Sequence, residues 1–344
     1  MEKSLIGNRT MGLDVLKYLC CFLIILLHVE FPGKLDERIT IFCRMAVPIF
    51  FMITGYFYTQ THERKRETKQ IKKIFILFVV ANLLYVVWVF AKLIMSGESV
   101  SEYVKGFLNV RTLIEFLVFN QSPHKNSVWY LSALLYALVL IWILGKLKIS
   151  TRKLYPLIPF LIVANLILGT YSVAIFGREF SVVYSRNFIF CGLPYILLGD
   201  FIYNYKDRFK KSVFTVLIPV FLCTTVLEYL ILSGRYDSFV QEQFISTFFL
   251  SFCVFNFFLK CENIFVGNAI FRKIAHFGQK YTLVIYVIHS IVIDFWIKGY
   301  GFISSKVESF SLALNILEPI VVLIVSTVCA WIASVIGKKL SKRS

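Results

Sequence analysis

Ten long apolar runs constrain this 344-residue chain more than any other feature of its sequence. About 20 consecutive apolar residues allow a helix to cross the hydrocarbon core of a bilayer. Only helices and closed barrels span lipid, because every backbone polar group needs a partner within the protein. The runs therefore predict an all-α, polytopic membrane helix bundle that forms a single integral domain over residues 1–344. The predicted spans are 12–29, 41–60, 71–94, 127–146, 154–173, 183–204, 212–233, 241–260, 280–297 and 312–336.

The composition excludes an ordinary soluble enzyme. Hydrophobic residues make up 58% of the chain and charged residues 17%, whereas soluble domains average about 45–50% and about 25%. The eight cysteines include no Cys-x-x-Cys pair, so the sequence predicts neither a metal site nor a disulfide framework. The abundance of Phe and Lys fits a bacterial plasma membrane.

The formal net charge of +17 would suggest nucleic-acid binding in a soluble protein. Here most basic residues lie in short loops between the apolar runs. When the N-terminus is placed inside, the inner loops are richer in Lys and Arg than the outer loops, as the positive-inside rule requires. We therefore predict an N-in, C-in protein of the cell membrane, with membrane lipids and not nucleic acid as partners.

The first span carries three ionisable side chains, which are costly in a bilayer and usually mark function. Asp14 and Lys17 are i,i+3 neighbours and can form an ion pair. His28 lies on nearly the same helix face, roughly 16 Å further along the axis at 1.5 Å per residue. Lys17 and His28 are therefore expected to line one cavity or tunnel from opposite ends.

Further polar and aromatic residues of other spans are expected in the outer half of the bundle. Their convergence predicts a polar cavity there, although each has a simpler interpretation. Trp129 and Tyr130 fit an interfacial aromatic belt. Glu228 could form an ion pair with Arg44 or Arg186, and His289 could be a hydrogen-bonded core residue. Asp14 and Lys17 alone could be an interfacial pair, and His28 alone a helix-end residue. The residues of other spans that are expected around the cavity are Arg44, Trp129, Tyr130, Arg186, Glu228 and His289.

The inner loop after the second span is the most basic one. Lys69 and Lys72 share a helix face, with Lys73 adjacent. Either these lysines only reflect the excess of positive charge in inner loops, or they bind the phosphates of a cytoplasmic ligand such as coenzyme A. Lysines bind phosphate as point charges, without the bidentate fork of arginine.

Several motifs along the chain resemble the acyltransferase-3 family of integral membrane O-acyltransferases. They are Gly12-Leu-Asp14-Val-Leu-Lys17 with His28 after ten more residues, Arg44-Met-Ala-Val-Pro48 leading to Thr54-Gly55-Tyr56, Trp129-Tyr130-Leu131, Arg186-Asn187, and Tyr286-Val-Ile-His289.

The resemblance implies a ten-helix bundle that moves acyl groups from cytosolic acyl-CoA to sugar hydroxyls of cell-surface glycans. It also implies that His28 is catalytic. The basic residue of the family's first span, usually Arg, falls on Lys17, and its Arg-x-x-Arg motif falls near Lys69 to Lys73, where this chain has lysines. In these departures the chain resembles one branch of the family, the membrane domain of vancomycin-resistance serine racemases. That domain is thought to import serine.

Two hypotheses follow. In the first, the chain is an O-acyltransferase, with acetyl-CoA or another acyl-CoA as donor. His28 is then the base, Arg44 or Arg186 stabilises the oxyanion, and Trp129 and Tyr130 stack on a sugar. In the second, the same cavity belongs to a transporter or flippase of a small polar solute, such as serine, or of a lipid-linked glycan. Substrate-binding residues in either case are Asp14, Lys17, Trp129, Tyr130, Glu228 and His289; the donor-binding residues are Lys69, Lys72 and Lys73.

Overall fold

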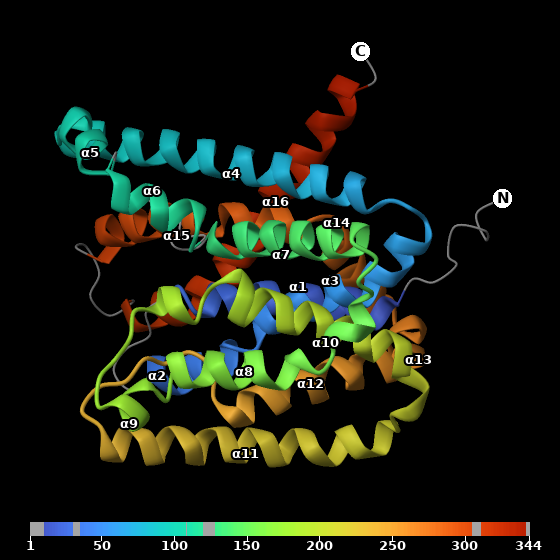
Figure 1. Cartoon of the computed structure of the whole chain (residues 1–344). Coiled ribbons are helices and arrows are strands. Elements are labelled where there is room, and N and C mark those ends of the chain that lie inside the picture. Colours follow the sequence, from blue (N-terminus) through green and yellow to red (C-terminus); the bar gives the residue numbers. More distant parts are fainter. Residues whose placement is uncertain (1–9, 30–34, 108, 120–127, 305–310, 342–344) are drawn as a thin grey trace. The chain divides into compact units, whose positions relative to one another are not determined.

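The computed structural model describes residues 10–29, 35–107, 109–119, 128–304 and 311–341 (Figure 1). Within these ranges the chain is helical and contains no strand, which confirms the predicted all-α membrane bundle. The described part divides into two compact units. Unit 1 takes its residues from 1–50, 207–228 and 246–344, and unit 2 from 51–206 and 229–245.

Seven helical segments of the described chain are long and apolar enough to cross a membrane. They match seven predicted spans. The other three predicted spans contain shorter helices: α1 (Met11–Leu26), α8 (Leu157–Leu168) and α12 (Ile245–Lys260). Ten crossings, the N-in, C-in topology and the single domain over 1–344 therefore stay predictions. The seven segments are Asp36–Glu63, Glu67–Ser96, Trp129–Lys146, Phe188–Arg208, Lys211–Arg235, Thr282–Gly299 and Ile316–Gly337.

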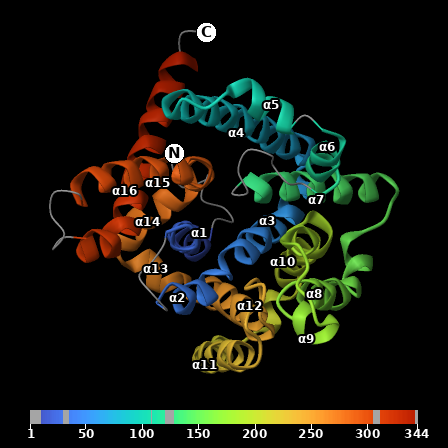
Figure 2. The ribbon, with the colours of Figure 1, turned by 90° about the vertical axis from the view of Figure 1, so that its left-hand side faces the viewer.

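Unit 1 is built around α1, which packs against several neighbours (Figure 2). The neighbours are α2 (Leu35–Cys43), α13 (Glu262–Gly267), α14 (Ala269–Lys280), α15 (Thr282–Ser304) and α16 (Ser311–Ser341). The Glu262 carboxylate accepts hydrogen bonds from the backbone N–H groups of Met11 and Gly12, at 2.5 and 2.9 Å. It thereby satisfies two of the N–H groups that a helix N-terminus leaves unpaired.

Unit 2 contains most of α3 (Ala46–Glu63) together with the helices up to α10. These are α4 (Glu67–Ser96), α5 (Val100–Phe107), α6 (Val110–Leu117), α7 (Trp129–Lys146), the 3-10 turn η2 (Thr151–Leu154), α8, α9 (Ser172–Phe176), the 3-10 turn η3 (Val182–Tyr184), the π-helical turn η4 (Phe188–Gly192) and α10 (Leu193–Tyr205). Remaining elements are α11 (Lys211–Arg235), shared by both units, and η5 (Lys206–Arg208).

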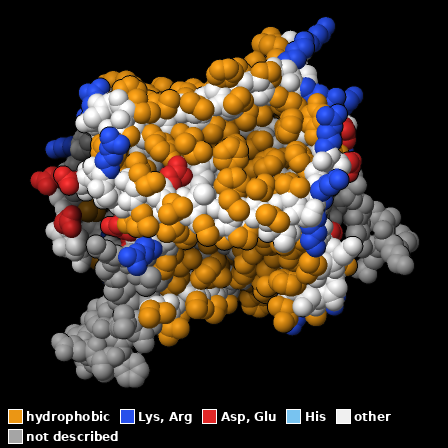
Figure 3. Space-filling view, turned by 90° about the horizontal axis from the view of Figure 1, so that it is seen from below, with side chains coloured by type: hydrophobic (Ala, Val, Ile, Leu, Met, Phe, Trp, Pro, Cys, Tyr) orange, Lys and Arg blue, Asp and Glu red, His pale blue; other side chains and the backbone are white. Residues whose placement is uncertain are grey.

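Several long helices expose apolar side chains, as contact with lipid requires. In each of α4, α11 and α16, at most 22% of the residues in an apolar 18-residue stretch of the helix are buried. Hydrophobic side chains cover most of the face drawn in Figure 3, and most of its charged side chains lie toward the left and right edges. These surfaces fit a multi-pass membrane protein, because a soluble monomer rarely exposes contiguous apolar patches of this extent.

Glycines set the closest helix contacts within each unit. In unit 2, a Cβ added at Gly55 of α3 would lie 1.9 Å from the Ile196 carbonyl oxygen of α10. One added at Gly199 of α10 would lie 2.0 Å from the Met52 carbonyl oxygen of α3. The two helices therefore approach backbone to backbone, the small-residue packing typical of membrane helices.

The substitution Gly55→Ala should destabilise the protein more than a substitution in open space. The added methyl group must displace a backbone carbonyl, and we expect the free energy of unfolding to fall by about 1–3 kcal/mol, the usual cost of overpacking. Gly234→Ala is the matched control, because no atom lies within 4 Å of its added Cβ. Thermal unfolding in detergent measures both, and equal melting temperatures would contradict the close contact.

Candidate functional site

The ionisable side chains at the start of α1 pair with each other, as their spacing predicts. The Lys17 ammonium lies 2.9 Å from Asp14 Oδ1. Asp14 is buried. A Cβ added at Gly278 would lie only 1.8 Å from the backbone oxygen of Asp14. This end of α1 is therefore held tightly against α14, with its two charges compensated.

The two histidines that the sequence singled out lie side by side in unit 1. The ring centroids of His28 and His289 are 5.2 Å apart, with an angle of 35° between the ring planes. His28 is exposed and follows the last turn of α1, where its N–H donates to the Ile25 carbonyl. His289, on α15, is only 1% exposed. An accessible imidazole thus lies against a buried one.

Hydrogen bonds orient the buried histidine. His289 Nδ1 lies 2.6 Å from the Tyr286 carbonyl oxygen. Because a carbonyl oxygen only accepts, Nδ1 carries a proton. His289 Nε2 lies 3.3 Å from the Ser290 hydroxyl. Such a fixed ring can orient its neighbour, and an accessible imidazole beside it can act as a general base.

Two further predicted residues of unit 1 lie near the starts of α3 and α12. Arg44 is half-buried between α2 and α3. Glu228, on α11, accepts from the Ser246 backbone N–H at 3.1 Å and from the Ser246 hydroxyl at 2.5 Å. Its carboxylate therefore stabilises the N-terminus of α12, where the helix dipole favours a negative charge.

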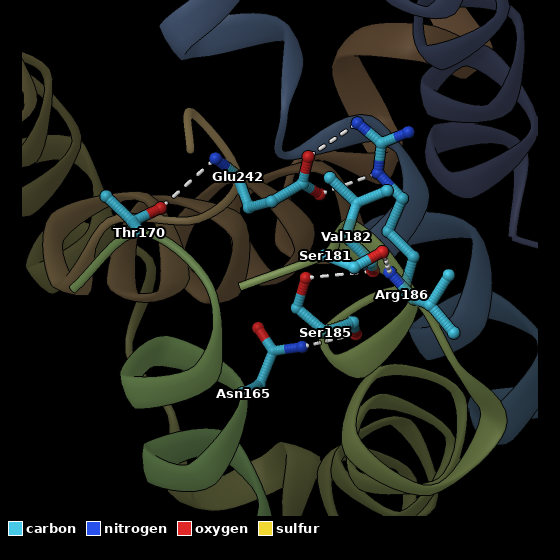
Figure 4. A network of polar contacts seen from close by, with 8 residues as sticks. Asn165, Thr170, Ser181, Val182, Ser185, Arg186 and Glu242 are labelled. Atoms are coloured by element: carbon cyan, nitrogen blue, oxygen red, sulfur yellow. Dashed lines mark hydrogen bonds and ion pairs between the residues drawn. The ribbon is translucent and has the colours of Figure 1, made fainter. Parts of the chain in front are cut away.

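In unit 2, Arg186 forms a bidentate ion pair that the sequence analysis did not foresee (Figure 4). Its Nε and Nη2 donate to the two carboxylate oxygens of Glu242, at 2.9 and 2.5 Å. The Glu242 N–H donates to Thr170 Oγ1 at 3.1 Å. Nearby, the Asn165 side chain donates to the Ser185 carbonyl at 2.7 Å. This network joins the segment after α9 to the segment before α12. The sequence signal for it was Glu242, an acidic residue at the start of a predicted span.

The predicted aromatic residues of α7 are buried rather than open. Trp129 is 9% and Tyr130 3% exposed. Both rings lie near Phe51, with centroid distances of 6.4 and 4.7 Å. In the described structure they therefore contribute to packing between α3 and α7.

The three predicted donor-binding lysines, Lys69, Lys72 and Lys73, are exposed on α4. Lys72 borders an apolar groove of about 610 Å³ between α4 and α7. Lys72 therefore lies beside a surface suited to hydrocarbon. Among the described residues, no three His, Cys, Asp or Glu side chains are placed to hold a metal ion.

The predicted outer cavity would draw on both units: His28, Arg44, Glu228 and His289 belong to unit 1, and Trp129, Tyr130 and Arg186 to unit 2. Each set is defined within its own unit, so one common cavity stays a prediction.

Comparison with known proteins supports the family resemblance. A family model described as an acyltransferase domain matches residues 11–335. Two amino-acid racemases of Enterococcus faecalis are similar to the chain. One is 26% identical over 218 residues, which is 58% of this chain and 29% of the racemase. The other is 25% identical over 236 residues, 64% of this chain and 29% of the racemase. The match thus spans less than a third of these relatives, and no solved structure matches.

Replacing Arg186 by Lys should destabilise the protein almost as much as replacing it by Ala. Lysine keeps the charge but loses the planar fork that pairs with both oxygens of Glu242. We expect either change to lower the free energy of unfolding by about 1–3 kcal/mol, because a carboxylate is left poorly paired. Arg178, which is exposed, is the control for loss of a surface charge. Unfolding of Arg186→Lys at the wild-type temperature would show that charge alone suffices.

Proposed function

This chain belongs to the acyltransferase-3 family, and we propose that it is an O-acyltransferase that moves an acetyl group from cytosolic acyl-CoA to a glycan hydroxyl. Membership makes it a multi-pass membrane enzyme that transfers acyl groups other than aminoacyl groups. The proposed acceptor is a cell-surface or lipid-linked glycan, and the proposed location is a bacterial plasma membrane. The observation that carries the proposal is the accessible His28 ring held against the oriented, buried His289.

In the proposed reaction His28 accepts the proton of the sugar hydroxyl as its oxygen attacks the thioester carbonyl. The C–O bond of the new ester forms, the C–S bond breaks, and the CoA thiolate leaves and takes up a proton. Arg44, which like His28 belongs to unit 1, stabilises the negative charge that develops on the carbonyl oxygen. Arg186, the other arginine that the sequence offered for this role, is held in its bidentate pair with Glu242. General base catalysis of this kind accelerates a reaction typically by about 10²–10⁴-fold.

The donor is proposed to enter from the inner side. Lys17 and the lysines of α4, Lys69, Lys72 and Lys73, would face its phosphates there. Trp129 and Tyr130 would then shape the acceptor side through their packing on Phe51. Asp14, Glu228 and His289 would act by holding charges and helix ends in place around the substrates.

A second candidate is transport of a small amino acid such as serine, or flipping of a lipid-linked glycan. The similarity to two amino-acid racemases favours it, because their substrates are amino acids. In this case the arginines would bind a carboxylate or phosphate, and no acyl group would move.

Acyl transfer by the purified protein should depend on His28. With acetyl-CoA and a glycan acceptor, His28→Ala should lower the rate by roughly 10²-fold or more, the range that loss of a general base produces. His276→Ala on α14 is the matched control, because this histidine is exposed and lies outside the proposed site. The rate is measured as release of free CoA thiol, with thermal unfolding as the test of folding.

Assays of the wild-type protein separate the two candidate functions, and His28→Ala tests the assigned base. If the wild-type protein releases no CoA thiol but takes up labelled serine into vesicles, the transport function replaces the acyltransferase proposal. If His28→Ala keeps the full transfer rate, the reaction is real but the assigned base is wrong.

A further inference from the structure

A second, polar pocket lies entirely within unit 2, at the end of the unit that the sequence predicts to be cytoplasmic. Its volume is about 380 Å³, within the range of pockets that hold small ligands. The ends of α3 and α7, the segment that follows α7, and α10 form its walls. Its polar lining comes chiefly from Thr59, His62, Glu63, Lys148, Ser150, Thr151, Arg152 and Asn204.

A buried aspartate fixes the walls of this pocket. Asp200 of α10 is 1% exposed and accepts hydrogen bonds from three hydroxyl groups. These belong to Thr59 on α3, to Thr151 at 2.8 Å, and to Tyr155 at 2.7 Å. A buried carboxylate is costly without such donors. Asp200 therefore ties α3, η2 and α10 together beneath the pocket.

The cationic side of the pocket is also held in place. Arg152 Nη2 donates to Asn204 Oδ1 at 2.6 Å, and Asn204 donates to the Tyr155 hydroxyl at 3.0 Å. Lys148, two residues after the end of α7, adopts the left-handed region, with φ of 61°. Glycine usually takes this position after a helix, since other residues adopt it at a conformational cost. A lysine here places a positive charge at the pocket where glycine would serve the backbone better.

The lining favours an anionic ligand. The lining carries two cations, Lys148 and Arg152, and one carboxylate, Glu63. His62 lies 2.6 Å from Glu67 and stacks on Tyr58, with an angle of 17° between the ring planes. Arginine offers a planar fork that suits phosphate oxygens. The lysines of α4 lack such a fork, and Arg152 supplies it.

We propose that this pocket binds the phosphate groups of a soluble cytoplasmic ligand, through Lys148 and Arg152. Where the proposed function holds, and on that premise alone, the ligand is the CoA part of the acyl donor. The hydroxyl groups and Asn204 then surround the phosphates, while the lysines of α4 contribute longer-range attraction.

Calorimetric titration of the full chain in detergent tests this site. The probes are CoA, pyrophosphate, and pantetheine, which has no phosphate. Lys148→Ala/Arg152→Ala should weaken binding of CoA and pyrophosphate by roughly 10-fold or more, as loss of charge-assisted hydrogen bonds does. Pantetheine binding should not change. The control Lys146→Ala/Lys153→Ala removes the same charge from the same segment outside the lining, and should keep CoA affinity within roughly threefold.

Equal weakening by both double variants would overturn the site, because charge and not the pocket would then account for binding. Unchanged CoA affinity in Lys148→Ala/Arg152→Ala would overturn it as well. Arg152→Lys guards against misfolding, since it keeps the charge and should retain part of the affinity for CoA.

Transfer assays separate this inference from the proposed function. If acetyl transfer occurs and the KM for acetyl-CoA is the same in Lys148→Ala/Arg152→Ala, the proposed function stands and the pocket assignment fails. If pyrophosphate binding depends on the pocket but no acyl transfer is found, the phosphate site stands and the acyltransferase proposal fails.

Discussion

Lipid is as apolar as the side chains that face it, so burial of apolar surface from water cannot hold membrane helices together. Close backbone approach replaces it in both units. Gly55 and Gly199 bring α3 and α10 into mutual contact, and Gly278 brings α14 against the backbone of α1 at Asp14. These contacts maximise dispersion attraction and leave no room for a Cβ. The positions of the polar residues on the same helices follow from this packing.

Polar groups then fix the register that glycine contacts allow. Asp200 collects three hydroxyl donors from two other segments, and Arg186 pairs with Glu242 across 56 positions of the chain. In a medium of low dielectric, such bonds are strong when complete and costly when broken. Each network therefore selects one arrangement of its helices. The same networks carry the candidate binding groups, such as Arg152 through Asn204.

The helices themselves could be predicted from hydropathy, because span length and composition are local properties. The Asp14–Lys17 pair could be predicted as well, since its i,i+3 spacing lies within one helix. The contact between His28 and His289 could not, because it depends on how α15 is rotated against α1. Asp200 carried a signal that was missed, an acidic residue inside a predicted span.

The position of His28 depends on both ends of α1. At its start, Glu262 caps the helix and Gly278 allows the closest contact with α14. Near its end, Ile25 lies in a buried apolar cluster with residues of α15 and α16. His28 follows three residues later, so its ring projects from a helix that is held near both ends, while the ring itself remains exposed. A base for a reaction at a membrane boundary needs this combination, because a group on a rigid element keeps its geometry while substrate reaches it.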